Sequence, residues 1–373
     1  MLQKIFRSVA DYLRLTDKLL WSFCIGLSAL SVLLLYSQYH FGFITLRVVL
    51  VQAIASVLGI ACAAVLSQVD YHLGDSLWKW HVALCVALIA ATFVLGVQNS
   101  GADDKAWLML PFGLYFQPSE LAKLSFIFTF AKHLQAVGDN INQYKNLALL
   151  ALHGAVPVLV IHFQGDDGTA LCFAVIFLFM LFSAGLSWRF IAAGVGAVVV
   201  AVPILWNFVL SDMQKRRFLI LFNPELDPLG DAFQQIQSKN AIGSGGVFGL
   251  GLFGETPVEV PYMRNDFIFA YIGQTMGFVG GTMVVLALLF VALKMLLNGL
   301  RSVDKYGYFI CVGVFAIFFF QIFINIGMCL GFMPVIGLTL PFLSAGGTSV
   351  VMLYLSVGIV QSVFMHGKRD LFS

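Results

Sequence analysis

The residues Ala241-Ile-Gly-Ser-Gly-Gly-Val-Phe-Gly-Leu-Gly-Leu-Phe-Gly254, followed by Asn265-Asp266-Phe267, decide how this sequence is interpreted. They are dense in glycine and only weakly hydrophobic, in a chain that otherwise consists almost entirely of long apolar runs. Irregular backbone near a bilayer is stable only where it meets water or is buried in protein. A connection of roughly fifty residues also exceeds an ordinary linker between two helices. We therefore expect chemistry in this region, at one surface of a membrane.

The composition places the whole chain in a membrane. Of its 373 residues 60% are hydrophobic and 11% are charged, and the mean hydropathy is +0.91. Soluble domains carry about 25% charged residues. The sequence therefore predicts one all-α, polytopic membrane domain over 1–373. A net charge of +2 argues against a nucleic-acid partner. The six cysteines lie in apolar runs without a C-x-x-C pair and are expected to be buried hydrophobic residues.

Apolar windows predict about ten spans. Their approximate limits are 19–37, 45–67, 79–98, 117–136, 147–163, 169–186, 189–210, 266–296, 307–331 and 341–365. An even number of spans places both termini on one side. Lys and Arg are roughly twice as frequent at that end, so the positive-inside rule predicts cytoplasmic termini, 1–18 and 366–373. The long loop 211–265, between spans 7 and 8, and the loops 98–118, 162–168 and 332–346 are then extracytoplasmic.

The segment Gln117-Pro118-Ser119-Glu120-Leu-Ala-Lys123 opens one of these spans. Pro118 suits a first helical turn and Glu120 suits a helix N-terminus. Lys123 has no such explanation, because an ionisable group inside a span is costly unless it has a partner. Glu120 lies one turn away and can pair with it.

The short turn Gln164-Gly165-Asp166-Asp167-Gly168-Thr169 has two explanations. It is a tight turn followed by a helix capped by Asp167 or Thr169, or it is a functional site. We leave both open, because two adjacent carboxylates are more than a turn requires.

Asn265-Asp266 precedes the eighth apolar run. The pattern favours Asp266 as an N-cap, but a carboxylate beside a glycine-rich segment could instead be a general base or a metal ligand.

The segment from Gly331 to Ser349 contains Pro334, Pro341 and several glycines. These residues predict a broken, re-entrant backbone between the last two spans rather than a plain turn.

Gly249-Leu-Gly251-Leu-Phe-Gly254 matches G-x-G-x-x-G literally. Dinucleotide binding requires that motif between a strand and a helix of a parallel unit. The preceding run 234–240 is polar and predicts no such strand, so we do not interpret the motif as a nicotinamide-binding site.

Together these segments resemble the SEDS family (shape, elongation, division and sporulation) of RodA/FtsW/SpoVE-type bacterial membrane proteins. The resemblance covers roughly 95–365, with its motifs in the family's order. The matching strings are Gln117–Lys123, Asp166 with Gly168-Thr169-Ala170, Ala241–Gly246, Asp266-Phe-Ile-Phe-Ala270, Asn325-Ile-Gly-Met, Leu340-Pro341-Phe and Gly346-Gly347.

The resemblance implies a peptidoglycan glycosyltransferase in the bacterial cytoplasmic membrane. Such a protein polymerises lipid II, the undecaprenyl-pyrophosphate-linked disaccharide peptide, on the outer face and works with a class B penicillin-binding protein. The family's activity-linked aspartate corresponds to Asp266, and Arg217 takes the place of a basic residue after the seventh span. The chain departs from the family at Asn265 (usually Thr), Gln274 (usually acidic), Gly165 (usually Pro) and Lys105-Ala106-Trp107 (usually Arg-Trp). These departures suggest a divergent member.

On this basis we expect Asp266 to act as the general base. The departing pyrophosphate would be bound by Arg216, Arg217, Lys239 or Lys105 and by the backbone of Gly243, Gly245 and Gly246. We expect no organic cofactor, although Mg²⁺ or Mn²⁺ could be held by Asp266 or Asp166. Supporting residues are expected to be Glu120, Lys123, Asp166, Thr169, Ser344, Gly346 and Gly347. A lipid II flippase and a non-catalytic scaffold remain alternatives, and roles in elongation, division and sporulation are not distinguished.

Overall fold

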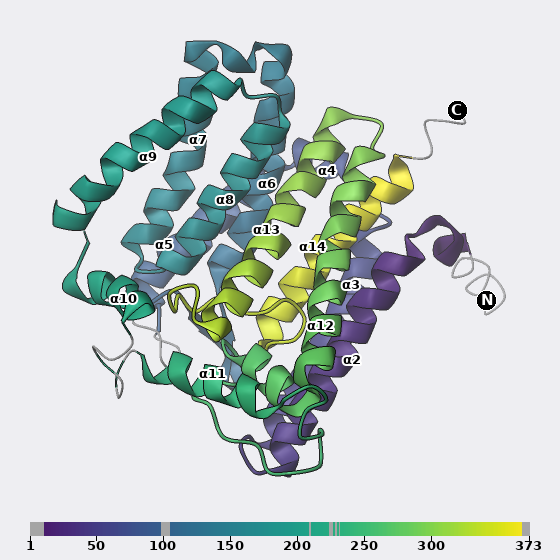
Figure 1. Cartoon of the computed structure of the whole chain (residues 1–373). Helices are drawn as coiled ribbons and strands as arrows, with labels where there is room; N and C mark the ends of the chain where they lie inside the picture. Colours follow the sequence, from purple (N-terminus) through teal and green to yellow (C-terminus); the bar gives the residue numbers. More distant parts are fainter. Residues whose placement is uncertain are drawn as a thin grey trace.

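The computed structural model describes residues 11–97, 105–208, 210–223, 227, 230 and 232–367. It is a bundle of long helices, with the shorter helices α10 and α11 at one end (Figure 1). The predicted all-α, multi-pass architecture is confirmed.

The first half of the chain supplies most of the helices at one side of the bundle. They are α2 (Lys18–His40), α3 (Leu46–Leu66), the short α4 (His72–Ser76), α5 (Trp78–Leu95), α6 (Pro118–Val137), α7 (Tyr144–Phe163) and α8 (Asp167–Ser183). A 3₁₀ turn, η2 (Gly138–Asn142), joins α6 to α7. As predicted, Pro118 is at the first position of α6.

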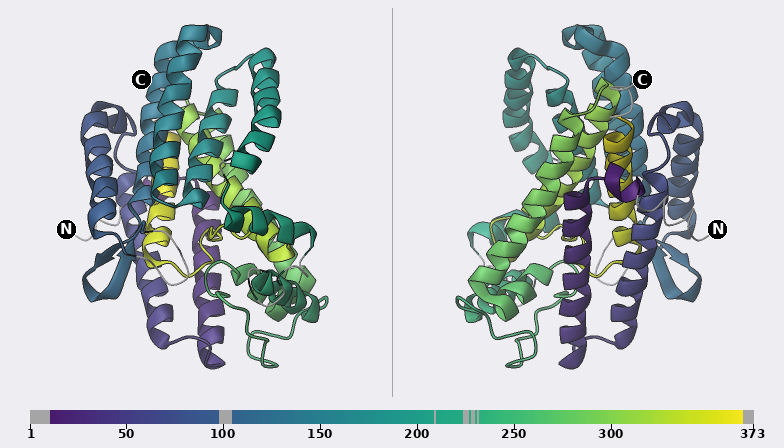
Figure 2. Two further views of the ribbon diagram at one scale, coloured as in Figure 1. Left: turned by 90° about the vertical axis from the view of Figure 1, so that its left-hand side faces the viewer. Right: turned by 90° about the vertical axis from the view of Figure 1, so that its right-hand side faces the viewer.

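The second half begins with α9 (Trp188–Phe208), α10 (Asp212–Phe222) and α11 (Phe233–Ser244). The long helices α12 (Ile268–Leu300), α13 (Lys305–Leu330) and α14 (Gly347–His366) follow. A kink at Gly277, whose φ is 66°, interrupts α12. No described residue in the apolar window of α9 is buried, and this helix stands apart from the bundle (Figure 2).

In the part of the chain that the structure describes, eight helices are long and apolar enough to cross a membrane: α2, α3, α5, α7, α9, α12, α13 and α14. The 17-residue α8 is shorter, and α6 carries charged residues such as Glu120 and Lys123. Both occupy predicted spans, so the count of about ten stays a prediction.

The structure differs from the sequence-based expectation at three places. The segment 211–265 contains α10 and α11 rather than loop alone. An unpredicted hairpin pairs β1 (Leu108–Leu110) with β2 (Leu114–Phe116) across the turn η1 (Pro111–Gly113), with Met109 opposite Tyr115. The last helix starts at Gly347 and not at 341. The amides of Ala345 and Gly346 instead donate to Arg264 O and to Gln52 Oε1, outside any helix.

Helix α13 lies at the centre of the bundle, and 83% of its apolar window is buried. Helices α3 and α14 approach closely through glycines. A Cβ on Gly59 would lie 2.7 Å from the Tyr354 ring, and one on Gly358 would lie 2.9 Å from Ala63. This contact brings the segment before α14 against α3.

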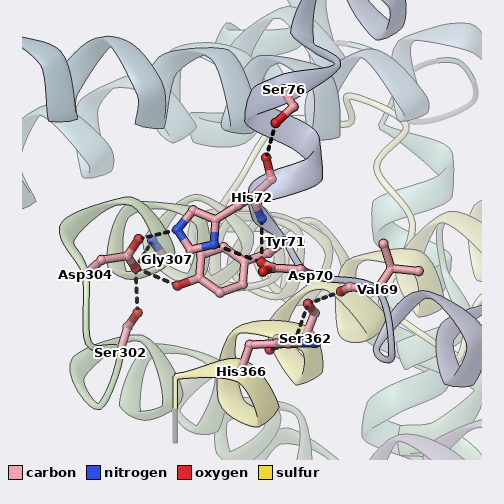
Figure 3. A network of polar contacts seen from close by, with 10 residues as sticks. All are labelled: Val69, Asp70, Tyr71, His72, Ser76, Ser302, Asp304, Gly307, Ser362 and His366. Atoms are coloured by element: carbon pink, nitrogen blue, oxygen red, sulfur yellow. Dashed lines mark hydrogen bonds and ion pairs between the residues drawn. The ribbon is translucent and has the colours of Figure 1, made fainter. Parts of the chain in front are cut away.

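At the end of the bundle opposite α11, polar side chains join two connections (Figure 3). His72 lies between Asp70 and Asp304, with each ring nitrogen 2.8 Å from a carboxylate oxygen. Asp304 also caps α13 through Gly307 N, and it accepts a 2.7 Å bond from Tyr71. This network fixes the α3–α4 and α12–α13 turns.

Candidate functional site

The segment 331–346 brings the polar residues together. It leaves α13 at Gly331, whose left-handed φ of 78° ends the helix, and it has no regular structure before α14. The predicted broken backbone is therefore present. Its carbonyl and amide groups contact α3, α8, α11 and the residues before α12.

Asp266 lies at the mouth of α12, and it does not cap the helix. The N-cap is Phe267, which makes no side-chain capping bond, so the interpretation that the pattern favoured is wrong. The helix begins one residue too late for the Asp266 carboxylate to reach its free amides. Among the described residues, the carboxylate has no hydrogen bond or ion pair, and Oδ2 lies 3.9 Å from the Cβ position of Gly337. Burial raises the pKa of Asp266 to about 6.

The backbone around Asp266 is fixed by two side chains. Asn325 Nδ2 on α13 donates to the carbonyls of Asp266, at 2.8 Å, and Leu338, at 2.7 Å. Ser344 Oγ donates to Asn265 O at 2.6 Å and accepts from Leu340 N at 2.8 Å. Ser344, expected to be a supporting residue, thus joins the entry to α12 with the 331–346 segment.

Gln52 on α3 holds the other end of that segment. Its Nε2 donates to Ser344 O at 3.2 Å and its Oε1 accepts from Gly346 N at 3.1 Å. A Cβ on Gly347 would lie 3.0 Å from Val51, so Gly346 and Gly347 permit close contact with α3. The sequence motifs did not include Gln52, and they included Asn325 without assigning it a role. Each is a polar residue inside an apolar run, which was an available signal.

A second polar cluster surrounds Asp166. This residue, rather than Asp167 or Thr169, caps α8, with Oδ1 accepting from Thr169 N at 2.9 Å. Its Oδ2 accepts from Gln117 Nε2 at 2.6 Å. Burial raises the pKa of Asp166, while the bonds from Thr169 and the Lys123 charge lower it.

The predicted Glu120–Lys123 pair is present. Lys123 Nζ lies 2.7 Å from Glu120 Oε1, and the Lys123 side chain is 1% exposed. The ion pair with Glu120 offsets the free-energy cost of placing a lysine inside a membrane span. The pair lies on α6, next to the Gln117–Asp166 bond.

The two carboxylate sites are joined through adjacent residues of the 331–346 segment. A Cβ on Gly168 would lie 2.5 Å from Ile336 O, while the neighbouring Gly337 approaches Asp266. The structure therefore brings the Asp166 cluster and Asp266 to opposite sides of one short stretch of backbone.

The glycine-rich segment packs into the kink of α12. A Cβ on Gly245 would lie 2.1 Å from Gly273 O, and one on Gly249 2.2 Å from Thr275 O. Gly246 O accepts from Phe278 N at 2.9 Å, and Leu250 N donates to Gln274 O at 3.0 Å. The amides of Gly245 and Gly246 already bond to local carbonyls. This geometry favours packing for Gly245, while Gly243 faces open space.

Of the basic candidates, Lys239 lies nearest to the 331–346 segment. Its Nζ is 3.3 Å from the Cβ position of Gly331, and it is exposed on α11. Arg216 on α10 forms a 3.4 Å ion pair with Asp227. The backbone of Arg217 is on α10. Lys105 is exposed before the hairpin, and no contact among described residues links it to Asp266.

Helix α11 is attached to the same segment by buried polar side chains. Gln235 Nε2 donates to Met333 O at 2.7 Å, and Ser238 Oγ donates to Cys329 O at 2.8 Å. These bonds hold Lys239 at the edge of the site.

Gln274, one of the departures from the family pattern, has a structural role. With its amide oriented to satisfy both atoms, it donates to Val258 O at 3.2 Å and accepts from Val258 N at 2.7 Å. It thereby holds the chain that leads toward Asp266.

Within the described residues, His, Cys, Asp and Glu side chains form no group of three that could hold a metal ion. Asp266 and Asp166 each offer one carboxylate, on opposite sides of residues 336–337. A Mg²⁺ ion bound to one carboxylate and substrate phosphates fits this arrangement better than an all-protein site. A cavity of about 360 Å³ lies elsewhere, between α2 and α12, and none of the expected site residues lines it.

The chain resembles known proteins in both sequence and fold. The chain is 34% identical over 319 residues to the peptidoglycan glycosyltransferase MrdB of Escherichia coli K12, covering 83% of this chain and 84% of that protein. It is 30% identical over 364 residues to the probable peptidoglycan glycosyltransferase FtsW of Geobacter metallireducens, covering 93% and 94%. A solved chain from a peptidoglycan synthase complex that coordinates polymerization and crosslinking matches with a TM-score of 0.83 and 27% identity, over 95% of this chain and 99% of that one. The profile of the FtsW/RodA/SpoVE cell cycle proteins matches residues 16–369, and this chain belongs to that family.

Proposed function

We propose that this protein is a peptidoglycan glycosyltransferase that polymerises lipid II, with Asp266 as its general base. One observation carries the assignment. Asp266 is a half-buried carboxylate with no hydrogen-bond or ion-pair partner among the described residues. Asn325 donates to the backbone carbonyl of Asp266 and Ser344 to that of Asn265, which holds Asp266 at the mouth of a membrane helix. Its raised pKa suits a base that takes up a proton near neutral pH. The named relatives are glycosyltransferases of the same family.

The reaction joins two lipid-linked sugars. A hydroxyl of one lipid II loses its proton to Asp266 and its oxygen forms a bond to the anomeric carbon of the other. The bond from that carbon to pyrophosphate breaks, and undecaprenyl pyrophosphate leaves. A positioned base contributes about 10²–10⁴-fold to such a step.

Charge on the departing pyrophosphate requires compensation. Lys239 contacts the 331–346 segment at Gly331, and Arg216 and Arg217 lie on α10. A bound Mg²⁺ or Mn²⁺ would neutralise phosphate charge in the same place. The proposed orientation puts this site on the outer face of the bacterial cytoplasmic membrane, with both termini cytoplasmic, as the Lys and Arg distribution supports.

The proposed partner is a class B penicillin-binding protein, which would crosslink the new glycan strand. The similarity to a chain of a peptidoglycan synthase complex supports this choice.

The decisive experiment uses the purified full chain with labelled lipid II, alone and with a candidate penicillin-binding protein, with and without EDTA. We expect wild-type protein to form glycan polymer and Asp266→Asn to form none while expressing normally. Lipid movement without polymer would identify a flippase, and neither activity would identify a scaffold. Loss of polymer in EDTA, restored by Mg²⁺ or Mn²⁺, would support the cation.

A further inference from the structure

Asp167 differs from its neighbour Asp166 in the direction of its contacts. Asp166 caps α8 and bonds to α6, whereas Asp167 contacts two other helices. Its Oδ1 lies 2.6 Å from His162 Nδ1 on α7, and its Oδ2 accepts from Gln214 Nε2 on α10 at 2.7 Å. Both oxygens of this carboxylate are therefore occupied, and α7, α8 and α10 meet at one residue.

Gln214 is held in the orientation that this contact requires. It is the third residue of α10 and completes a capping box with Ser211. Its Oε1 accepts from Ser211 N at 3.1 Å, which leaves Nε2 to donate to Asp167. Glutamate would serve the capping box equally well, but it would place a carboxylate against Asp167. The amide is the group that satisfies both contacts.

Among the residues that the structure describes, few other contacts locate α10. Among its described side chains, Ile220 is the one that is buried. Helix α9, which leads to α10, has no buried residue in the described part of its apolar window and stands apart from the bundle (Figure 2). A hydrogen bond between half-exposed groups contributes modestly by itself. Such a bond has a larger effect on the position of a helix that buries little apolar surface.

We propose that Asp167 is a positioning residue that fixes α10, the helix that carries Arg216 and Arg217. This inference rests on the proposed function, because it assigns those cations to the pyrophosphate of the lipid-linked substrate. Asp167 acts through Gln214 and does not touch the substrate. Misplacing α10 weakens substrate binding and leaves the chemistry at Asp266 unchanged, which affects KM rather than kcat.

The test compares two variants of the same pair in the lipid II polymerisation assay. Gln214→Glu keeps the capping box but places the glutamate carboxylate against that of Asp167. We therefore expect KM to rise roughly tenfold, as for loss of a charge-assisted hydrogen bond, with kcat little changed. Adding Asp167→Asn supplies an amide donor to the new carboxylate, and we expect KM to return close to the wild-type value. An unchanged KM in Gln214→Glu, or no recovery in the double variant, overturns the proposal.

A second readout does not depend on activity. Spin labels at Lys215→Cys on α10 and Leu178→Cys on α8 report the position of α10 directly. We expect one narrow distance distribution with the native pair, a broader one with Gln214→Glu, and recovery in the double variant. The same distribution in all three proteins would contradict the proposal that Asp167 fixes α10. If instead the distances change as expected and wild-type protein makes no polymer, the proposed function fails while the role of Asp167 in fixing α10 is retained.

Discussion

Asn325 Nδ2 lies 2.8 Å from the carbonyl oxygen of Asp266, and the same nitrogen lies 2.7 Å from Leu338 O. One buried amide on α13 thus holds the entry to α12 and the 331–346 segment together. The carboxylate of Asp266 is consequently aligned without a hydrogen bond of its own among the described residues.

Replacing Asn325 with leucine removes both bonds and leaves two carbonyls without this donor. We expect the free energy of unfolding to fall by about 1–3 kcal/mol and kcat to fall roughly 10- to 100-fold, because misplacement of a base by about 1 Å is costly. Thermal unfolding in detergent and polymerisation kinetics measure the two effects. Thr129→Val on α6 is a control, since Thr129 bonds within α6 and to His153 and should leave kcat unchanged. Full activity in Asn325→Leu would show that the alignment has another source.

The Glu120–Lys123 pair should respond differently to single and double substitutions. Lys123 is 1% exposed and Glu120 is 13% exposed, so removing one partner leaves a poorly solvated charge. We expect Lys123→Met to destabilise the protein by about 3–5 kcal/mol, and the double variant with Glu120→Gln to recover most of that loss. The comparison requires unfolding midpoints of all four proteins. Additive losses would mean that the two side chains are not coupled.

The glycine segment offers a matched pair of substitutions. A Cβ at Gly245 would lie 2.1 Å from Gly273 O, whereas one at Gly243 would meet nothing within 4 Å. We expect Gly245→Ala to lower the unfolding temperature by several degrees, corresponding to about 1–3 kcal/mol of overpacking. Gly243→Ala should be tolerated, because alanine favours the helix α11. If lipid II binding falls in Gly243→Ala with stability intact, the backbone there contacts substrate.

Much of this architecture could be predicted from sequence because local pattern determines it. Long apolar runs fixed the helices, Pro118 marked the start of α6, and the cost of a charged group in a span predicted the partner of Lys123. The glycine and proline pattern of 331–349 likewise predicted the broken backbone.

The remaining features depend on contacts between distant residues. Gln52 and Ser344 are far apart in sequence, and only the packing of α3 against α14 brings them together. The choice between Asp166 and Asp167 as cap, and the failure of Asp266 to cap α12, depend on where each helix begins within one residue. Sequence patterns locate helix ends less accurately than that.

We expect the Asp266 carboxyl group to lower the polymerisation rate below about pH 6 and to lower the free energy of unfolding above about pH 6. Its pKa of about 6 lies above the ordinary aspartate value of 3.8, so the proton is retained in the folded state over a range where the unfolded chain has lost it. Polymerisation should therefore rise with pH through about 6, as the base becomes ionised. The stability that this raised pKa provides is complete below about 4 and is lost as pH increases through about 6.

Above about pH 6 the folded protein consequently holds an ionised carboxylate that has no hydrogen-bond or ion-pair partner among the described residues. Asp266→Asn removes that charge, and we expect the variant to be inactive yet more stable than wild type by on the order of 2 kcal/mol at pH 8. At pH 4 the two proteins should unfold at nearly the same temperature, since both are neutral at this position.

Thermal unfolding in detergent across pH 4–8 tests this, with Asp167→Asn as a control at a carboxylate whose oxygens are already hydrogen-bonded. Equal unfolding temperatures of wild type and Asp266→Asn at pH 8 would mean that the carboxylate is stabilised after ionisation, as a bound cation would do. Repeating the comparison in EDTA then separates that explanation from solvation by water, because only the cation is removed by the chelator.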